Sequence, residues 1–390
     1  MVEQSVLRAH QEHFGEAGRA STAPGRVNLI GEHTDYTGGF VLPMAIDFQT
    51  TAVISPRQDR KAVFYSNNFE EEAAAFEIGS LHVAPQGHWS DYPAGVLWSL
   101  AQAGVSMSGF AMSIGGDVPL GAGLSSSASV EVATAMALLG HAGVILSLEE
   151  VATLCRRAEN EYVGAKSGIM DQFIVTGGVA GRAMLLDCRS LAYTMLPLPA
   201  SVKVVVCNSM VKHAHADGEY GNRRDEVEAG QAVVVRERPG IAMLRDATVE
   251  DLEACRKDMT PESFLRCRHI VTENVRVEEA RGALLAGDMK RFGDLMEQAH
   301  ASFRDDFGAS CAEIDTLVKI ASRQPGCFGA RITGGGFGGC TVNMVRAEDV
   351  SRFVETLRRE YAEATGISAD CFVCEASDGA LALAAKEEKR

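Results

Sequence analysis

The sequence predicts an α+β protein of two domains, and three observations carry the prediction. A chain of 390 residues with 46% hydrophobic content can bury more core than one domain usually holds. Strand patterns mark the first third: residues 40–55 are apolar and include the β-branched run Thr50 to Ile54, and residues 62–65 resemble a further strand. After Asn208 the pattern changes to charged segments with helical spacing. We therefore place a boundary near residue 207, which gives domains 1–207 and 208–390.

The remaining elements follow from periodicity and capping signals. An Ala-rich segment predicts a helix over about 127–139, and Ser147 with Glu150 forms a capping box that begins a helix ending at Gly164. Strands are expected at 183–186 and 202–206, and helices at 223–236, 249–257 and about 261–286. Two late segments, 341–345 and 371–374, read as strands, the second of them buried.

Composition excludes several function classes. The net charge of -15 argues against nucleic-acid or anionic-membrane partners, which need clustered basic residues. No secretory leader or long apolar run is present, so we expect a cytoplasmic protein. The ten cysteines lack the density of a disulfide framework, and Cys371 and Cys374 have no second pair to complete a zinc site. His213 and His215 lie in a polar stretch and are interpreted as solvated.

A Gly/Ser-rich turn over residues 121–129 reads Gly-Ala-Gly-Leu-Ser-Ser-Ser-Ala-Ser and leads into the predicted helix. Glycines let the backbone approach an anion, hydroxyls donate to phosphate oxygens, and the helix start supplies unpaired N–H groups. The turn lacks the lysine of the P-loop and the glycine spacing of the dinucleotide fingerprint. A phosphate cradle and an ordinary loop both remain open from this segment alone.

A second glycine cluster, residues 333–340, has five glycines in six positions. Because such a run costs chain entropy, we expect a backbone that turns tightly against a large flat group or another loop. An elaborate tight turn is the alternative.

Two polar segments could carry chemistry. In residues 23–36, Glu32, His33 and Asp35 place three hydrogen-bonding side chains within four positions, which suits a polyol, although a surface loop would also explain them. In residues 168–173, Asp171 lies among apolar side chains and could be a general base with Arg26 as its cation, or a structural cap. Glu159 falls at the edge of a buried helix face, where it could reach a cleft.

Together and in this order, segments 23–36, 119–129, 168–173 and 333–340 resemble the motifs of the GHMP small-molecule kinases. Within them, residues 31–36 (Gly-Glu-His-Thr-Asp-Tyr) are similar to the signature of the galactokinase branch, and the resemblance runs from about residue 20 to beyond 345. It implies a ribosomal-S5-like mixed N-terminal domain and a ferredoxin-like C-terminal domain with the active site in the cleft between them. The implied reaction transfers the γ-phosphoryl group of MgATP to the C1 hydroxyl of α-D-galactose, the first committed step of galactose catabolism.

The resemblance also implies roles for individual residues. The sugar would be bound by Glu32, His33, Asp35, Gly168, Asp171 and Tyr220. Asp171 would act as the base, and Arg26 would steady it and the charge developing in transfer. The ATP phosphates would lie against Gly121, Gly123, Leu124, Ser125, Ser126 and Ser127, and the adenine against Trp89 and Tyr92. Ser127 and Glu159 would be the Mg²⁺ ligands.

Two alternatives stay open beside this interpretation. A related chain can bind galactose and ATP as a silent sensor, but the intact Ser127-Ala128 step and Asp171 favour catalysis. A kinase for a related sugar, such as N-acetylgalactosamine, would use the same chemistry. The expected partners are D-galactose and ATP, with no nucleic acid or membrane, and we expect a monomer.

Overall fold

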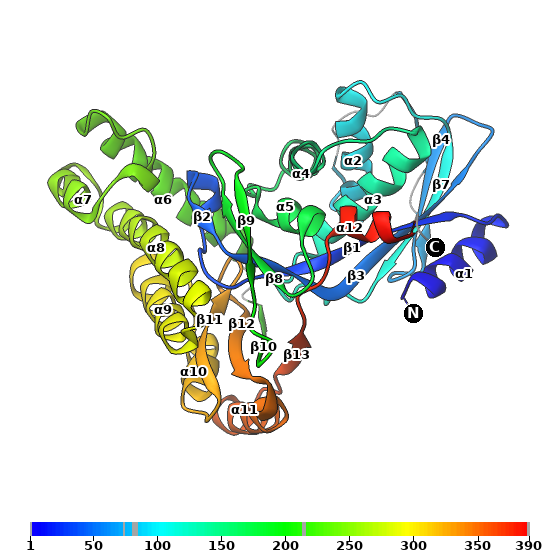
Figure 1. The fold of residues 1–390 in the computed structure, drawn as a ribbon. Coiled ribbons are helices and arrows are strands. Elements are labelled where there is room, and N and C mark those ends of the chain that lie inside the picture. Colours follow the sequence, from blue (N-terminus) through cyan, green and yellow to red (C-terminus); the bar gives the residue numbers. More distant parts are fainter. Residues whose placement is uncertain (1, 73–74, 80–84, 213–215, 388–390) are drawn as a thin grey trace.

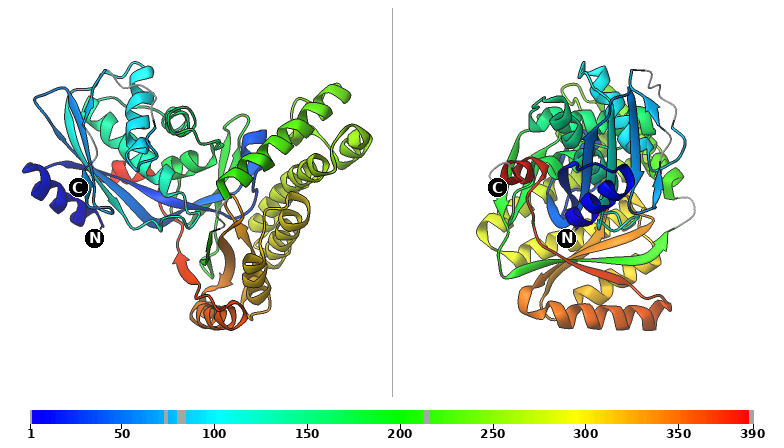
Figure 2. Two further views of the ribbon diagram at one scale, coloured as in Figure 1. Left: turned by 180° about the vertical axis from the view of Figure 1, so that it is seen from behind. Right: turned by 90° about the vertical axis from the view of Figure 1, so that its right-hand side faces the viewer.

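A computed structural model describes residues 2–72, 75–79, 85–212 and 216–387. The helices and strands form two units, each made of sheet and helices, which we call the N-terminal layer and the C-terminal layer. The two diverge from a shared junction, and the long strands of the N-terminal layer run toward it (Figures 1 and 2). His213 and His215 lie outside the described residues.

Among the described residues, the N-terminal layer is built on a six-stranded sheet in the order β1-β3-β7-β4-β5, with β6 paired to β4. Its pairs are antiparallel except β4 with β7. Its strands are β1 (Arg19–Asn28), β3 (Pro43–Pro56), β4 (Lys61–Ser66), β5 (Glu71–Glu72), β6 (Phe76–Glu77) and β7 (Phe110–Gly116). A smaller sheet contains β2 (Phe40–Val41), β8 (Arg182–Asp187) and β9 (Tyr193–Pro197). The strands expected at 40–55, 62–65 and 183–186 are confirmed.

Side-chain alternation decides which helices cover each face of the large sheet. Ile54 and Met112 join a core cluster with helices α2 and α3. The next residue on each strand, Ser55 and Ser113, hydrogen-bonds instead with buried His10 of α1. The helices of this layer are α1 (Val2–Phe14), α2 (Asp91–Gln102), α3 (Ser126–Ala142), α4 (Leu148–Arg157), α5 (Met170–Gly177) and the short η1 (Asp35–Thr37).

The predicted capping box begins α4 as expected. The Ser147 hydroxyl accepts from the Glu150 N–H at 3.3 Å, and the Glu150 carboxylate accepts from the Ser147 N–H at 2.8 Å. The helix continues as a π-helical turn, η2 (Ala158–Val163), and ends at Gly164 in a left-handed conformation. Such π turns often mark functional positions, and this one carries Glu159.

The described C-terminal layer contains a four-stranded antiparallel sheet in the order β11-β12-β10-β13. Helices separate β10 from β11 and β12 from β13, so the topology is ferredoxin-like. The strands are β10 (Val202–Lys212), β11 (Cys327–Thr333), β12 (Gly338–Arg346) and β13 (Asp370–Cys374). The helices are α6 (Ala216–Glu237), η3 (Leu244–Asp246), α7 (Val249–Cys255), η4 (Arg256–Asp258), α8 (Pro261–Ala286), α9 (Met289–Ser302), η5 (Phe303–Phe307), α10 (Ala312–Ser322), η6 (Ala347–Asp349) and α11 (Val350–Thr365). The α+β class and the predicted helices at 223–236, 249–257 and 261–286 are confirmed.

The prediction of a buried strand at 371–374 is wrong in part, because the strand forms but is not fully buried. β13 pairs with β10 on one side and with no other described strand, so it is a sheet edge. Cys374 is buried, whereas Val373 is 42% exposed. The ten cysteines, which all lie in the described ranges, are free thiols.

The two layers share a hydrophobic core where they meet. Leu29 and Met44 of the first layer pack in one cluster with Phe292 and Met344 of the second. Helix α12 (Ala380–Glu387) returns from the C-terminal layer to pack on β1 and α5 (Figure 1). Strand β10 runs through residue 207, and the division into 1–207 and 208–390 stays a prediction. None of the helices in the described part of the chain has the length and apolar character needed to cross a membrane.

Candidate active site

A polar cavity of about 430 Å³ lies at the junction of the two layers. Its lining comprises Arg26, Glu32, His33, Asp35, Ser167, Gly168, Met170, Asp171, Tyr220, Gly334 and Gly335. The structure therefore brings together all the residues predicted to contact the sugar, although they span nearly 200 positions of the sequence. Arg26 and part of the second glycine cluster line the same cavity. The sugar-binding roles of the residues predicted to contact the sugar stay a prediction.

Glu32 is held rigidly at one wall of this cavity. Its Oε1 accepts from the Arg331 guanidinium at 2.9 Å, from the Thr333 hydroxyl at 3.1 Å and from the Gly334 N–H at 3.0 Å. Arg331 is only 1% exposed, so this is a buried, charge-assisted contact. The interactions at Oε1 leave Oε2 available to a ligand in the cavity.

His33 adopts a left-handed backbone conformation (φ 62°), which is unusual for a residue other than glycine. Its ring packs against Phe307 with centroids 4.1 Å apart, and its Nδ1 lies 3.1 Å from the Tyr36 hydroxyl. Burial, followed by the neighbouring His269, lowers the pKa of His33 to about 3. The imidazole is therefore neutral near pH 7 and has one donor and one acceptor.

Asp35 and Gly168 fit directly against each other. A Cβ atom on Gly168 would lie 1.7 Å from Asp35 Oδ2, so only glycine leaves the carboxylate where it is. Asp35 Oδ1 accepts from the Tyr36 N–H at 2.9 Å. Burial, followed by the charge of Asp171, raises the pKa of Asp35 to about 6.

Asp171 and Arg26 form a bidentate ion pair. Arg26 Nε donates to Asp171 Oδ1 at 2.7 Å, and its Nη2 donates to Oδ2 at 2.5 Å. Burial opposes the Arg26 charge, but Asp171 offsets it and the pKa of Arg26 is raised. The Ser125 hydroxyl also donates to Asp171 Oδ2. Ser125 was expected to contact phosphate, and the structure shows its hydroxyl bound to Asp171.

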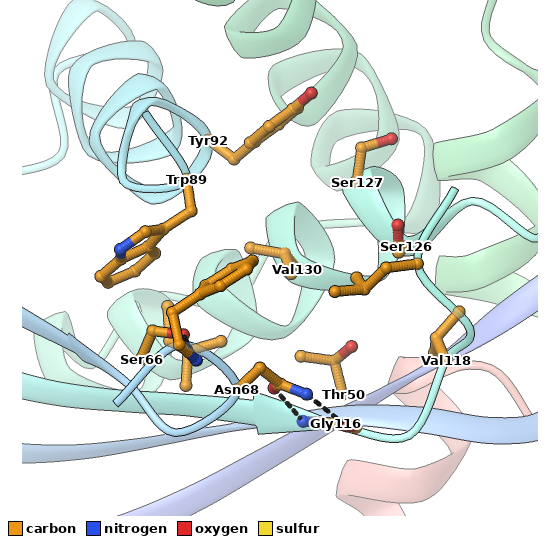
Figure 3. A pocket seen from close by; sticks show the side chains of 13 residues that line it. Thr50, Ser66, Asn68, Trp89, Tyr92, Gly116, Val118, Ser126, Ser127 and Val130 are labelled. Carbon is orange, nitrogen blue, oxygen red and sulfur yellow. Dashed lines mark hydrogen bonds between the residues drawn. The ribbon is translucent and has the colours of Figure 1, made fainter. Parts of the chain in front are cut away.

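A second, more apolar pocket of about 680 Å³ adjoins the start of α3. Figure 3 shows Trp89 and Tyr92 on one side of it and Ser126 and Ser127 on another. These four residues were predicted to line a nucleotide site, and they share one pocket. Its lining also includes residues that sequence reasoning did not single out: Thr50, Ser66, Asn68, Phe69, Ile114, Gly116, Val118, Leu120 and Val130.

The Gly/Ser-rich turn lies between the two cavities. Gly121 and Gly123 both have φ of 69°, which fits their predicted use in a tight turn. Gly123 O accepts from the Arg26 guanidinium at 2.6 Å, and Leu124 O accepts from the Arg26 backbone N–H at 3.0 Å. The Leu124 side chain lies in the shared core, so any phosphate contact it makes must come from its backbone.

The second glycine cluster packs against this turn and against α6. A Cβ on Gly334 would meet Gly123 at 3.8 Å, and one on Gly335 would meet the Tyr220 ring at 3.0 Å. A Cβ on Gly336 would lie 2.5 Å from the Ala309 carbonyl oxygen, and the φ angles of Gly334, Gly336, Gly338 and Gly339 are positive, so the structure bears out both the close approach to another loop and the tight turn.

Ser127 lines the second pocket, and Glu159 supplies a buried carboxylate near its hydroxyl. Glu159 is 8% exposed, and the neighbouring Ser127 hydroxyl acts to lower the pKa of its carboxyl group. Burial raises the pKa of Glu159 despite the hydrogen bonds from Ser167 and others that lower it. Within the described ranges, no group of three or more His, Cys, Asp or Glu side chains could hold a metal by itself. Two oxygen donors beside bound phosphates are nevertheless sufficient for Mg²⁺.

Several residues at the site were missed by sequence reasoning. Arg331 anchors Glu32, Gln172 and Ser167 hold Glu159, and Glu273 accepts from the Gly31 N–H at 2.9 Å. Gln172, Ser167 and Arg331 lie beside more conspicuous residues of the motifs, and Glu273 lies far in the sequence from any of them. No local pattern marks Glu273 either, because the buried face of α8 also carries Arg266, His269 and Asn274.

Three segments of this chain match known protein-family models. A galactokinase galactose-binding signature covers residues 8–56, the GHMP kinase N-terminal domain covers 85–178, and the GHMP kinase C-terminal domain covers 280–363. A curated galactokinase from Roseiflexus sp. (strain RS-1) is 43% identical over 97% of both chains. One from Chloroflexus aurantiacus is 42% identical over the full length of both.

Solved structures agree. The galactokinase of Lactococcus lactis, crystallised with galactose, superposes with a TM-score of 0.92 at 34% identity, covering 96% of this chain and 98% of that one. The Methanococcus jannaschii mevalonate kinase, at 20% identity and a TM-score of 0.65 over 93% and 99% of the two chains, shares the fold. This chain belongs to the galactokinase family of the GHMP kinases.

Proposed function

We propose that this protein transfers the γ-phosphoryl group of MgATP to the C1 hydroxyl of α-D-galactose, giving α-D-galactose 1-phosphate and ADP. The observation that carries the proposal is the position of Asp171. It lines the polar cavity, and it also accepts from Ser125, which directly precedes the helix that brings Ser126 and Ser127 to the second pocket. A hydroxyl bound at Asp171 therefore lies beside the predicted phosphate-binding turn.

The polar cavity suits a sugar. The Glu32 and Asp35 carboxylates accept from hydroxyl groups, and the neutral His33 ring can donate and accept. Tyr220 adds an aromatic wall, with its ring 5.2 Å from that of His33. Galactose is the sugar named for the curated relatives and for the Lactococcus lactis complex, and a sugar is what these side chains are equipped to hold.

In the proposed reaction the C1 oxygen forms a bond to the γ-phosphorus while the bond from that phosphorus to the ADP oxygen breaks. The hydroxyl proton passes to Asp171. Arg26 and Ser125 together occupy both acceptor positions of Oδ2 and one of Oδ1, so Oδ1 has a position left for the sugar hydroxyl. Arg26 holds the carboxylate in place, which matters because phosphoryl transfer depends mainly on positioning and charge neutralisation.

Ser127 and Glu159 fit a magnesium ion, because hydroxyl and carboxylate oxygens are the donors it prefers. When bound with ATP, the ion would neutralise charge on the β- and γ-phosphates. Trp89 and Tyr92 would take the adenine, and Gly121, Gly123, Ser126 and Ser127 the phosphates.

A coupled ADP-release assay with MgATP tests the function. It compares galactose with N-acetylgalactosamine, glucose and arabinose as acceptors. We expect turnover with galactose well above the other three. Silence on all four sugars would favour a sensor and refute the proposal, and preference for N-acetylgalactosamine would redirect it to another sugar. The relatives favour neither alternative, since they are named galactokinase.

A further inference from the structure

Gln172, the residue after the proposed base, connects three elements inside the protein. It lies on α5 and is fully buried. Its Nε2 donates to Glu159 Oε2 on η2 at 2.8 Å and to Glu131 Oε2 on α3 at 3.0 Å. An amide nitrogen has two hydrogens, so these two carboxyl groups use its full donor capacity.

At one end of this connection, Glu159 is held by one oxygen. Its Oε2 accepts from Gln172 and also from the Ser167 hydroxyl at 2.5 Å. Ser167 is itself fixed by Asn160, whose side-chain oxygen accepts from the Ser167 N–H at 2.9 Å. Both acceptor positions of Oε2 are therefore taken by the protein, and Oε1 is the oxygen left for a ligand.

At the other end, Glu131 occupies a position where a hydrophobic residue would pack at lower cost. It is 0% exposed, and its Oε1 has no hydrogen-bond partner among the described residues. Burial, followed by the charge of Glu159, raises the pKa of Glu131 well above its ordinary value. In the described structure the Glu131 side chain makes one hydrogen bond, which it accepts from Gln172. We therefore infer that Glu131 serves to accept this hydrogen bond.

We propose that Gln172 and Glu131 are positioning residues for the divalent cation of the phosphoryl transfer. Glu131 fixes the Gln172 amide, and the amide fixes the Glu159 carboxylate so that Oε1 faces Ser127 and the nucleotide pocket. Because Asp171 and Gln172 are consecutive on α5, the same helix turn sets the place of the base and of the metal-binding carboxylate. This inference rests on the proposed function, in which Ser127 and Glu159 hold Mg²⁺.

The test compares four variants of the full chain. Gln172→Met removes the donor at similar size, Glu131→Leu removes its acceptor, and Glu131→Gln keeps an acceptor oxygen at similar size. Thr134→Val is the matched control, since Thr134 is also fully buried on α3 and its hydroxyl has no partner in the described part of the chain. The primary measurement is Mn²⁺ affinity by electron paramagnetic resonance with a non-hydrolysable ATP analogue, beside the Mg²⁺ dependence of turnover and galactose affinity by calorimetry.

We expect Gln172→Met and Glu131→Leu to weaken Mn²⁺ binding by at least about tenfold, the loss typical when a residue supporting a metal ligand is removed. Galactose affinity should stay within about twofold, and Glu131→Gln and Thr134→Val should match the parent protein. If Gln172→Met does not fold, the contrast between Glu131→Leu and Glu131→Gln decides. Unchanged Mn²⁺ affinity in the disrupting variants, or an equal loss in Thr134→Val, would overturn the inference. A parent protein that binds Mn²⁺ and nucleotide but phosphorylates no galactose would instead overturn the proposed function.

Discussion

Gly168→Ala tests the contact between Gly168, just before α5, and the carboxylate of Asp35, which we propose binds the sugar. The new Cβ would lie 1.7 Å from Asp35 Oδ2 and 2.2 Å from its Cγ. Real Cβ atoms essentially never approach closer than 3.0 Å, so the carboxylate must move by about 1.3 Å. Gly168 is not among the glycines with positive φ, so alanine suits its backbone and the effect comes from the added methyl group alone.

A displacement of about 1 Å at a positioning group costs on the order of 10²-fold in rate. We therefore expect kcat/KM for galactose to fall by about that factor, or about 2.7 kcal/mol of transition-state stabilisation. The KM for ATP should not change, because Gly168 does not line the second pocket, where we propose that the nucleotide binds. The coupled ADP assay, with each substrate varied at saturating levels of the other, separates the two parameters.

Gly282→Ala is the matched control. Gly282 lies exposed on α8, and no described atom would come within 4 Å of its Cβ. This variant should keep full activity and gain up to about 1 kcal/mol of stability from better helix propensity. A Gly168→Ala protein with kcat/KM within twofold of the parent would refute the placement of Asp35 in the sugar site.

Three further predictions concern the charged groups of the site. Asp171→Ala should lower turnover by about 10²- to 10⁴-fold while calorimetry finds galactose still bound, and near-normal turnover would exclude Asp171 as the base. The pKa of Asp35 is raised from an ordinary 3.8 to about 6, and in the proposed site a sugar hydroxyl would donate to the ionised form. Hence kcat/KM should rise with pH up to about 6, and the unfolding free energy should fall from about pH 4 to 6 as the buried carboxyl group ionises. Asp35→Asn should abolish both trends. If the trends persist in that variant, they belong to another group. Arg331→Met leaves Glu32 as an unpaired buried charge, so urea titration should show a loss of about 3–5 kcal/mol together with a raised KM for galactose, and an unchanged unfolding midpoint would contradict the buried pair.

The elements of the fold were predictable where local signals are strong. The capping box at Ser147, the β-branched run in β3 and the glycine that ends η2 depend on neighbours within a few residues, and the structure confirms each. The segment 371–374 was misjudged because a strand's burial depends on its place in the sheet. An apolar pattern does not reveal that β13 forms the edge and leaves Val373 exposed.

The candidate site was predictable from its motifs and less so from its contacts. The family resemblance identified residues from Arg26 to Tyr220 that share one cavity in the structure. It did not predict that the Ser125 hydroxyl binds Asp171, nor that Gln172 connects Glu131 to Glu159, because such pairs arise from packing between helices and loops distant in sequence.

The central claim is that the two pockets meet at Asp171 so that the C1 hydroxyl of galactose receives the γ-phosphoryl group. The most direct test is ³¹P and ¹H NMR of the protein incubated with MgATP and galactose. We predict one new phosphate ester, with phosphorus coupled to the α-anomeric proton, and ADP formed in equal amount. Release of inorganic phosphate without an ester, or an ester at a carbon other than C1, would contradict the claim.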